Sequence, residues 1–487
     1  MVALHTQGQA IAAEPPSAGH TVYRLSDALA ALTERHPRLQ ELRARLDGEL
    51  AKVESAETRF DPSLELKLDL TDERVTVQDM SGSVRPFDTQ RLSAEAALQK
   101  PLSWGGQLRL SLNQSRLDTD NPFRSCVPGV TSDICFESRL QLQLTQPLLR
   151  GRGAVNESAL RQAAAVKSAE DAAQQEALEE LVLSVAQGYA ALAEAEARER
   201  VQTTSLAQSE RRLEEGELRV EAGVLAAGEL SGLRFGVAQA KRALSEARRV
   251  RAEASAQLSQ LTHEVPSGET EALSAVLIPP DAPLEELPSM RRFHFQLKAL
   301  EAEQLVLEDA LKSQLDLGLV WSQSGLGVES GEALRQLPQN QSRFYGVTLS
   351  YQRPLSNRAD AELRVIRARV RALEAQRSAE FVRLRESRRA LRIQRDQQLR
   401  LIEESEAAVQ AATEALRFEE ERFQAGRSTT TSLRQAEQER LQAELTLRGS
   451  EIEKFRIQLR RLRFAGGLLA SFPISSASAS RIERALK

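Results

Sequence analysis

The sequence predicts a mainly α-helical fold with a membrane β-barrel, in which long antiparallel coiled-coil hairpins build a tube, rod or stalk and each chain holds two tandem repeats. Long stretches almost free of Gly and Pro carry apolar residues three, four or seven positions apart, which indicates packed helices. Several shorter segments alternate apolar and polar residues, which indicates strands with two different faces. A similar pattern occurs twice along the chain, which indicates duplication of one unit.

The composition narrows the possible classes. The chain has 487 residues, of which 28% are charged and only 4% are aromatic, and its net charge is −4. Low aromatic content is usual for coiled coils, and the near-neutral charge gives no reason to expect a nucleic-acid partner. No run approaches the ~18 consecutive apolar residues that a transmembrane helix needs. This length would ordinarily hold about three domains, but the duplication favours two repeats of one unit.

The N-terminal segment, residues 1–20, has a pattern that is incomplete for a secretory signal. It lacks a basic start and an apolar centre, although Ile11-Ala12-Ala13-Glu14 resembles the small-residue end of a signal peptide. Either the chain stays in the cytosol or its true start lies upstream.

The first repeat, residues 21–263, begins with a helix that reaches about Phe60. Ser26-Asp27 is the predicted N-cap, and Pro37 predicts a break or kink near His36. Four segments of about nine residues then alternate apolar and polar side chains. A strand of that length, when tilted, crosses a bilayer with its apolar side chains toward lipid, although a soluble sheet can carry the same alternation. The apolar residues are Leu64, Leu66, Leu68 and Leu70; Leu92, Ala94, Ala96 and Leu98; Leu108, Leu110 and Leu112; and Leu140, Leu142 and Leu144.

The connections between these segments alternate in length. Residues 71–90 and 116–138 are predicted long loops, and Pro101 to Gly106 is a short turn that includes Trp104. Long loops on one side and tight turns on the other are typical of barrels. Cys126 and Cys135 lie in the second long loop, and they form a candidate disulfide of an oxidising compartment; two free thiols are the alternative.

Two helical hairpins follow the two groups of strands. The first begins near Asn156 and ends near Leu261, and a Pro-containing linker, residues 264–289, leads to the second repeat, residues 290–467. This repeat has a helix to about Lys312, strands at 315–321 and 345–351, and a hairpin from about Ala359 to Phe464. An arm of roughly 65 residues spans on the order of 100 Å. The tail, residues 468–487, is Ser/Ala-rich and predicted to be loosely ordered after Ile474.

The two hairpin tips carry the same pattern of residues. Arg219-Val220-Glu221-Ala222-Gly223 is followed by Leu230, and Arg422-Phe423-Gln424-Ala425-Gly426 is followed by Leu433, an offset of 426 − 223 = 203 residues. A Gly at the end of a long helical run is a C-cap signal, with positive φ expected. We therefore select six residues for contacts within the tip or with a partner, while helix-end packing explains them equally well. These are Ala222, Gly223, Leu230, Ala425, Gly426 and Leu433.

No catalytic, cofactor-binding or metal site is predicted, so the chain is not expected to be an enzyme. The five histidines are scattered and have neither a neighbouring nucleophile nor metal-ligand spacing. Gly151-Arg152-Gly153 opens a helix as a phosphate-binding turn does, but the fingerprint is incomplete. The charged helices also lack the interleaved aromatic residues that stack on nucleic acids.

The ordered motifs resemble those of the TolC-like outer-membrane efflux family across most of residues 22–467. The matching motifs are Asp61-Pro62-Ser63-Leu64, Gln146-Pro147-Leu148, Glu221-Ala222-Gly223, Gln424-Ala425-Gly426 and Leu462-Arg463-Phe464-Ala465-Gly466-Gly467. The resemblance implies a homotrimer with a β-barrel in the lipid of the cell outer membrane and a helical barrel across the periplasm. It also implies docking of the tips to a periplasmic adaptor protein and an inner-membrane pump or exporter, in tripartite efflux or type I secretion.

Two departures from the family pattern limit this comparison. Ser432-Leu433-Arg434-Gln435 lacks the Asp residues that ring the inner mouth of the pore in the best-known member. The first half also has four predicted strands where the family usually has two, so a trimer would have 18 strands instead of 12. Alternatively, the segments near 64–70 and 92–98, or the pair at 92–112, form a side hairpin.

Under this resemblance we expect a truncated or misassigned start, with the mature protein beginning near Glu14. The alternative function is a soluble coiled-coil scaffold with a small sheet. The alternating segments distinguish the two, because a scaffold does not need apolar strand faces of membrane length.

Overall fold

The computed structural model describes residues 22–32, 36–78, 84–119, 134–223, 226–271, 273, 278–339, 342–353 and 358–471. These fall into two compact units, each built from segments distant in sequence. The first contains the described parts of Met1–Arg43, Gln174–Met290 and Glu380–Lys487, and the second contains those of Ala44–Ala173 and Arg291–Ala379. Both units draw on both predicted repeats.

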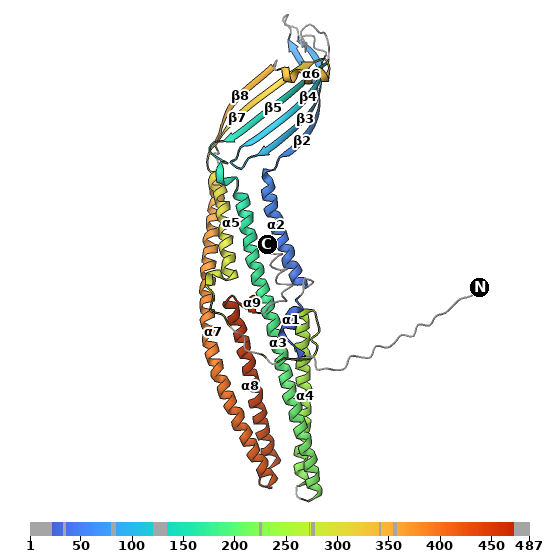
Figure 1. Cartoon of the computed structure of the whole chain (residues 1–487), viewed down its shortest axis with the longest axis vertical. Coiled ribbons are helices and arrows are strands. Elements are labelled where there is room, and N and C mark those ends of the chain that lie inside the picture. The colour runs from blue at the N-terminus through green and yellow to red at the C-terminus, as the bar shows by residue number, and fades with distance from the viewer. Residues whose placement is uncertain are drawn as a thin grey trace, which may run out of the picture. The chain divides into compact units, whose positions relative to one another are not determined.

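The second unit is organised around one antiparallel six-stranded sheet (Figure 1). Every strand pairs with its neighbour in this sheet, so the alternative in which two of the segments form a separate side hairpin is wrong. The strands, in sheet order, are β2 (Ser63–Gln78), β3 (Val84–Pro101), β4 (Gln107–Thr119), β5 (Ile134–Pro147), β7 (Gln314–Gly327) and β8 (Ser342–Gln352).

The predicted long loop 71–90 is wrong over most of its length. Strands β2 and β3 continue to Gln78 and from Val84, because backbone pairing extends past the last alternating apolar residue. The second predicted loop shortens for the same reason, since β4 reaches Thr119 and β5 begins at Ile134. Residues 120–133, with Cys126, lie outside the described residues.

Helices precede and accompany this sheet. The unit includes most of α2 (Pro37–Glu57), which leads through the short helix η1 (Thr58–Phe60) into β2, and most of α5 (Pro288–Ala310), which leads into β7. Helix α6 (Ser330–Gln336), followed by η4 (Leu337–Gln339), folds onto β5 and β7. Gly325 permits this approach, because a Cβ there would lie 2.2 Å from the Ala333 carbonyl oxygen.

The first unit is helical. Its long helices are α3 (Ser158–Glu221), most of which belongs to this unit, α4 (Ala227–Thr262), the C-terminal part of α7 (Arg358–Gln424) and α8 (Thr430–Phe464), which confirms the two predicted hairpins. Hydrogen bonds join α7 to α8 through Gln398 and α3 to α8 through Arg456. Among the described residues, no helix is both long enough and apolar enough to cross a membrane.

The core of the helical unit joins its N-terminal, central and C-terminal segments. Leu29 of α1 (Leu25–Ala30), Tyr189 of α3, Leu258 of α4 and Leu462 of α8 are all buried together. Leu468 of α9 (Leu468–Ser471) is also fully buried there, so the described start of the predicted tail is part of the core.

A two-stranded parallel sheet borders this core. Strand β1 (Val22–Tyr23) pairs with β6 (Glu269–Thr270), which belongs to the predicted linker; η3 (Leu284–Glu286) lies farther along that linker. The buried Glu196 carboxylate accepts hydrogen bonds from the Thr270 amide, at 2.8 Å, and hydroxyl, at 2.6 Å. The Tyr189 hydroxyl donates to the Tyr23 carbonyl at 2.9 Å.

The helix break before Pro37 is confirmed, because α1 ends at Ala30 and α2 begins at Pro37. Pro at the first helical position needs no amide partner. The predicted N-cap at Ser26-Asp27 is wrong, since Arg24 is the N-cap of α1. Asp27 lies three residues later and accepts a hydrogen bond from the Arg24 amide at 2.9 Å, as in a capping box.

Candidate functional site

The sheet has one continuous apolar face. Antiparallel pairing sets the alternating apolar residues of neighbouring strands opposite one another, for example Leu66 with Ala96 and Leu319 with Val347. The strands at the two ends of the sheet are the most exposed, with Leu66 and Val347 each 74% exposed. Because unpartnered apolar surface of this extent marks an interface with protein or lipid, this face is the first candidate site.

Aromatic residues mark the ends of the apolar row on the β7–β8 pair. Trp321 lies opposite Tyr345 at one end, and Tyr351 lies opposite Leu315 at the other. The row of seven residues extends roughly 23 Å along a strand. Membrane-spanning strands carry such apolar bands, with aromatic residues at the two lipid–water boundaries.

The opposite face of the sheet is polar and internally paired. The Arg109 guanidinium of β4 reaches across two strands, and it donates to Glu95 of β3 at 3.0 Å and to Glu65 of β2 at 3.1 Å. Lys67 forms an ion pair with Asp69 at 3.0 Å on the same face. The two faces therefore differ as a membrane-spanning sheet requires, with one apolar and the other hydrophilic.

The strand-to-helix junction is closed to a phosphate ligand. The Gly151 amide donates a 2.6 Å hydrogen bond to the buried Asp309 carboxylate, and the Asn156 side chain donates to the Gly151 carbonyl. The Gly153 amide donates to the Trp104 carbonyl. Since both glycine amides are occupied, this turn has a structural role. The Trp104 side chain is 55% exposed.

The predicted tips lie at the ends of the two helical hairpins. Gly223 and Gly426 have φ values of 73° and 69°, which confirms the left-handed turns predicted from sequence. The Gly426 amide donates to the Phe423 carbonyl, and the Arg427 amide donates to the Arg422 carbonyl, so that the last carbonyls of α7 are satisfied.

The six selected tip residues divide by exposure. Leu433 is buried, at 3% exposure, and Leu230 is half-buried, so both are placed for packing within the tip. The other four are exposed and available to a partner: Ala222, Gly223, Ala425 and Gly426.

A contact that the sequence did not reveal joins the two hairpins near their tips. The Glu229 carboxylate of α4 accepts hydrogen bonds from the amide and the hydroxyl of Thr430, at the start of α8. A carboxylate at a helix N-terminus satisfies a free amide and favours the helix dipole. Gly232 lies one turn along α4, where a Cβ would be 3.1 Å from the Thr430 hydroxyl.

Exposed aromatic residues in the same region were also missed. Phe235 and Phe418 are 60% and 61% exposed, and the Arg434 guanidinium lies 5.6 Å from the Phe235 ring centroid. Their signal in the sequence was a large aromatic residue on a helix face that otherwise carries small or polar residues around Phe235 and mostly charged residues around Phe418. Such exposed rings favour a protein contact.

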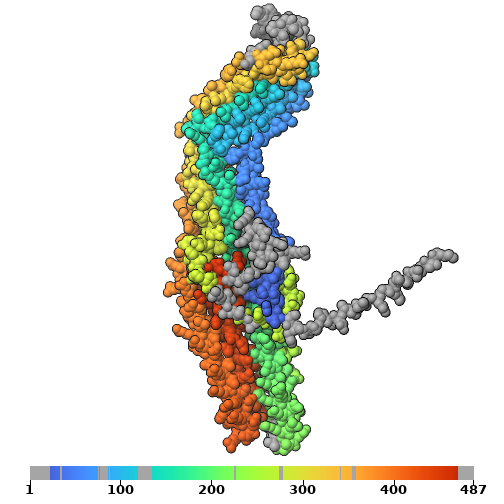
Figure 2. All heavy atoms as spheres, viewed as in Figure 1, coloured from blue at the N-terminus to red at the C-terminus, as the bar shows by residue number. Residues whose placement is uncertain are grey.

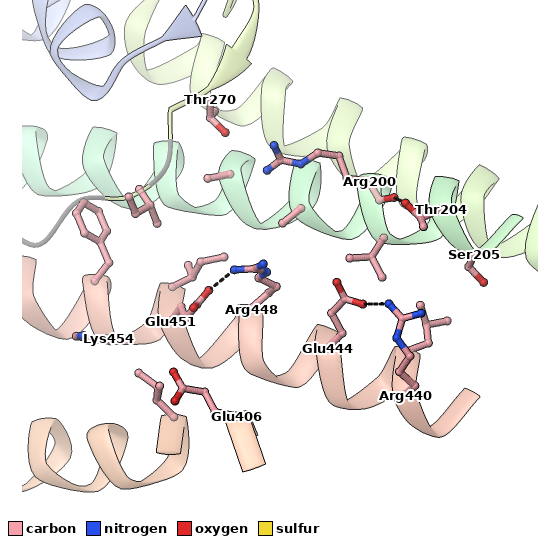
Figure 3. A pocket seen from close by; sticks show the side chains of 18 of the residues that line it. Arg200, Thr204, Ser205, Thr270, Glu406, Arg440, Glu444, Arg448, Glu451 and Lys454 are labelled. Atoms are coloured by element: carbon pink, nitrogen blue, oxygen red, sulfur yellow. Dashed lines mark hydrogen bonds and ion pairs between the residues drawn. The ribbon is translucent and has the colours of Figure 1, made fainter. Parts of the chain in front are cut away.

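A pocket of about 720 Å³ lies among α3, α7 and α8 of the helical unit (Figure 3). Two ion pairs lie within its lining: Arg440 with Glu444 at 3.1 Å and Arg448 with Glu451 at 2.9 Å. Arg212 also lines the pocket and forms ion pairs with Glu420 and Glu437, while burial lowers the pKa of its guanidinium. Because side chains of both signs line it, the pocket presents no strong preference for one charged ligand.

The described residues contain no group of three or more His, Cys, Asp or Glu side chains that could hold a metal ion. Cys135 is buried and disulfide-bonded, and its expected partner Cys126 lies outside the described residues. The pairing of these two residues therefore stays a prediction.

Comparison by sequence finds no match. No model of a protein family fits the chain, and no curated protein matches it.

Comparison by structure finds outer-membrane channels. The outer membrane protein VceC from Vibrio cholerae superposes with a TM-score of 0.64 at 17% identity, over 92% of this chain and 95% of the other. The CmeC outer membrane channel of Campylobacter jejuni superposes with a TM-score of 0.66 at 12% identity, over 95% of this chain and 89% of the other. The open state of the MtrE outer membrane channel of Neisseria gonorrhoeae superposes with a TM-score of 0.57 at 17% identity, over 92% of this chain and 88% of the other. The TolC-like resemblance is thus confirmed for the fold.

Proposed function

We propose that this chain, which has the fold of outer-membrane channels, is the outer-membrane channel of a tripartite efflux or type I secretion system. It would act as a passive exit duct for small molecules or proteins. The observation that carries the proposal is the continuous apolar face of the six-stranded sheet, in a chain that also contains two long helical hairpins. A water-exposed sheet does not require such a face, whereas a sheet in lipid does.

The proposal includes a homotrimer. A single chain has an open sheet with two free edges, β2 and β8, and an open edge leaves backbone groups unpaired, which lipid does not tolerate. Closing the sheet into a β-barrel requires further copies. Three copies are expected from the TolC-like resemblance, with the barrel in the outer membrane and the helices in the periplasm.

The hairpin tips are proposed to dock a periplasmic adaptor protein, and through it an inner-membrane pump or exporter. The exposed positions of Ala222, Gly223, Ala425 and Gly426 support this role, and Phe235 enlarges the candidate surface. Leu230 and Leu433 are assigned instead to packing within the tip.

No catalytic role is proposed, because the solved structures with this fold are described as channels. The alternative function, a soluble coiled-coil scaffold, is disfavoured by the exposed leucines of β2, which are 67–75% exposed.

Membrane fractionation tests the proposal. The native protein should remain with the outer membrane until detergent is added, and it should run on gels as an oligomer that heat dissociates. Recovery of the protein in the soluble fraction without detergent would favour the scaffold instead.

A further inference from the structure

The two free edges of the sheet are complementary to each other. Strands alternate in direction across the sheet, so β2 and β8 run in opposite directions. Strand β8 of one copy can therefore lie antiparallel to β2 of the next, without a parallel pair at the junction. Figure 2 shows the sheet as one surface from β2 at one edge to β8 at the other.

The pairing within the sheet is staggered relative to the apolar face. Starting from Leu64, at the base of the apolar row of β2, the line of directly paired residues ends at Tyr345, at the opposite end of the row of β8. The row of β8 extends six residues farther, to Tyr351. The complete line passes through Leu64, Leu98, Leu110, Leu142, Trp321 and Tyr345.

We propose that copies of this chain join by pairing β8 of one copy with β2 of the next in one specific register. In this register the numbers of any two residues that lie directly opposite each other add to 415. The membrane setting of this strand pairing rests on the proposed function. In this register each of the four apolar residues of β8 lies opposite an apolar residue of β2. The pairs are Leu64 with Tyr351, Leu66 with Leu349, Leu68 with Val347, and Leu70 with Tyr345.

Charge complementarity supports the same register. Beyond the apolar rows, Asp72 of β2 lies opposite Arg343 of β8, since 72 + 343 = 415. Both side chains are exposed at the sheet edges. A shift by two residues to a register in which the paired numbers add to 417 would place Asp72 opposite Tyr345. It would also move Leu64 past Tyr351, the last apolar residue of β8. Opposite charges directly across a strand pair stabilise it.

The stagger also matches what a closed barrel needs. This register shifts the strands by six residues for every six strands, or one residue per strand. A barrel in which the shear equals the number of strands has a tilt of about 36°, as in eight-stranded barrels of shear 8. Membrane barrels have tilts of about 35–45°. This tilt does not depend on the number of copies, because each copy adds six strands and a shear of six residues, and the ratio of shear to strand number stays the same.

For three copies the barrel has 18 strands. With strands about 4.8 Å apart and tilted by about 36°, its backbone diameter is about 34 Å. Barrels of 16–18 strands keep an aqueous channel. The polar face with Arg109, Glu65 and Glu95 would then line a water-filled lumen.

Cysteine cross-linking tests the register. The variant Leu66→Cys/Leu349→Cys, in a background of Cys126→Ser/Cys135→Ser, should form covalent oligomers on non-reducing denaturing gels. The matched control Leu66→Cys/Tyr345→Cys, displaced by four residues, should run as a monomer after boiling. Cross-linking of the control but not of the test pair, or of neither pair in an intact heat-labile oligomer, would overturn the register while leaving the channel function in place.

Charge reversal provides a test without engineered cysteines. Asp72→Arg and Arg343→Asp should each lower the temperature at which the native oligomer dissociates, and the double variant should restore it. Equal, additive losses in the double variant would exclude the proposed pair. A wild-type chain that never reaches the outer membrane would instead contradict the proposed function itself.

Discussion

Glu179 of α3 is a buried carboxylate that makes the stability of the helical unit depend on pH. Glu179 is 7% exposed, and its carboxylate oxygen lies 3.7 Å from the guanidinium nitrogen of Arg463 in α8. Burial raises its pKa to about 7, from an ordinary value of 4.5, while Arg463 opposes the rise and Glu176 adds to it. The folded protein therefore keeps a proton between about pH 4.5 and 7 that the unfolded chain releases.

We expect the free energy of unfolding to fall as pH rises through this window, since the folded state binds more protons. Glu179→Gln should remove this dependence and raise the free energy of unfolding at pH 8 by up to about 3 kcal/mol. Thermal unfolding of the detergent-solubilised protein at pH 5 and pH 8 measures both effects. Glu246→Gln, at an exposed helix position, is the matched control. Hydrogen bonding to Arg249 lowers the pKa of the Glu246 carboxyl, which therefore stays ionised in the folded protein above pH 5, so this variant should leave the difference in stability between pH 5 and pH 8 unchanged. An unchanged profile for Glu179→Gln would show that this group is not responsible.

Gly223 and Gly426 test the tips at the scale of single residues. A Cβ at either position meets no atom within 4 Å, so the cost of Val would come from positive φ rather than from a clash. Such strain costs on the order of 1–3 kcal/mol. Gly223→Val and Gly426→Val should abolish transport while the oligomer still assembles. Gly228→Val, in the first turn of α4 and with similar free space, is the control; normal efflux in both tip variants would contradict the docking role.

At the scale of elements, the Glu229–Thr430 contact should hold the start of α8 against α4. Glu229→Ala leaves the Thr430 amide without its acceptor, which we expect to cost about 1–2 kcal/mol. Hydrogen exchange should become faster at the first turn of α8, and Glu221→Ala, an exposed carboxylate in the same tip, should have no such effect. Equal exchange rates in the two variants would show that the contact does not stabilise α8.

The attachment of α6 to the sheet depends on Gly325. A methyl group there would overlap the Ala333 carbonyl oxygen, whereas the same change at Gly331 meets no atom within 4 Å. Gly325→Ala should therefore displace α6 and expose the segment from Ser330 to Gln336 to limited proteolysis. Gly331→Ala should remain as resistant as the wild type, and equal resistance of both variants would contradict this role of Gly325.

At the scale of the whole molecule, the two faces of the sheet should differ in their tolerance of charge. Leu142 and Gln141 are neighbours in β5 on opposite faces. Leu142→Arg should prevent assembly in the outer membrane, because Arg near the middle of a lipid-facing strand costs about 2–4 kcal/mol. Gln141→Arg should assemble normally, and quantitative fractionation compares the two. Equal recovery in the outer membrane would contradict a lipid contact at the apolar face.

Much of the fold could be predicted from local patterns. The apolar alternation at 64–70 located β2, and the glycines at 223 and 426 located both tips, because strand faces and helix ends depend on a few neighbouring residues. Strand ends were not predictable in the same way. Strands β2 and β3 continue through the polar residues of the predicted loop 71–90, where backbone pairing and the ion pair between Arg74 and Asp88 hold them together.

The residues of the candidate site could be predicted only in part. Ala222 and Ala425 were found from a repeated motif, but Leu433 proved to be buried. The Glu229–Thr430 contact joins residues 201 positions apart. Neither hydrogen-bonding partner carries a local signal that names the other.

By itself, the sequence determined the helical hairpins, their tips and the alternation of the strands, because these features depend on periodicity over a few turns or residues. Only the tertiary structure decided that all six strands share one sheet, how they are staggered, and which residues join the two hairpins. The physical reason is that strand pairing and helix packing are contacts between distant segments, whose partners are selected by competition among all the surfaces that the chain brings together.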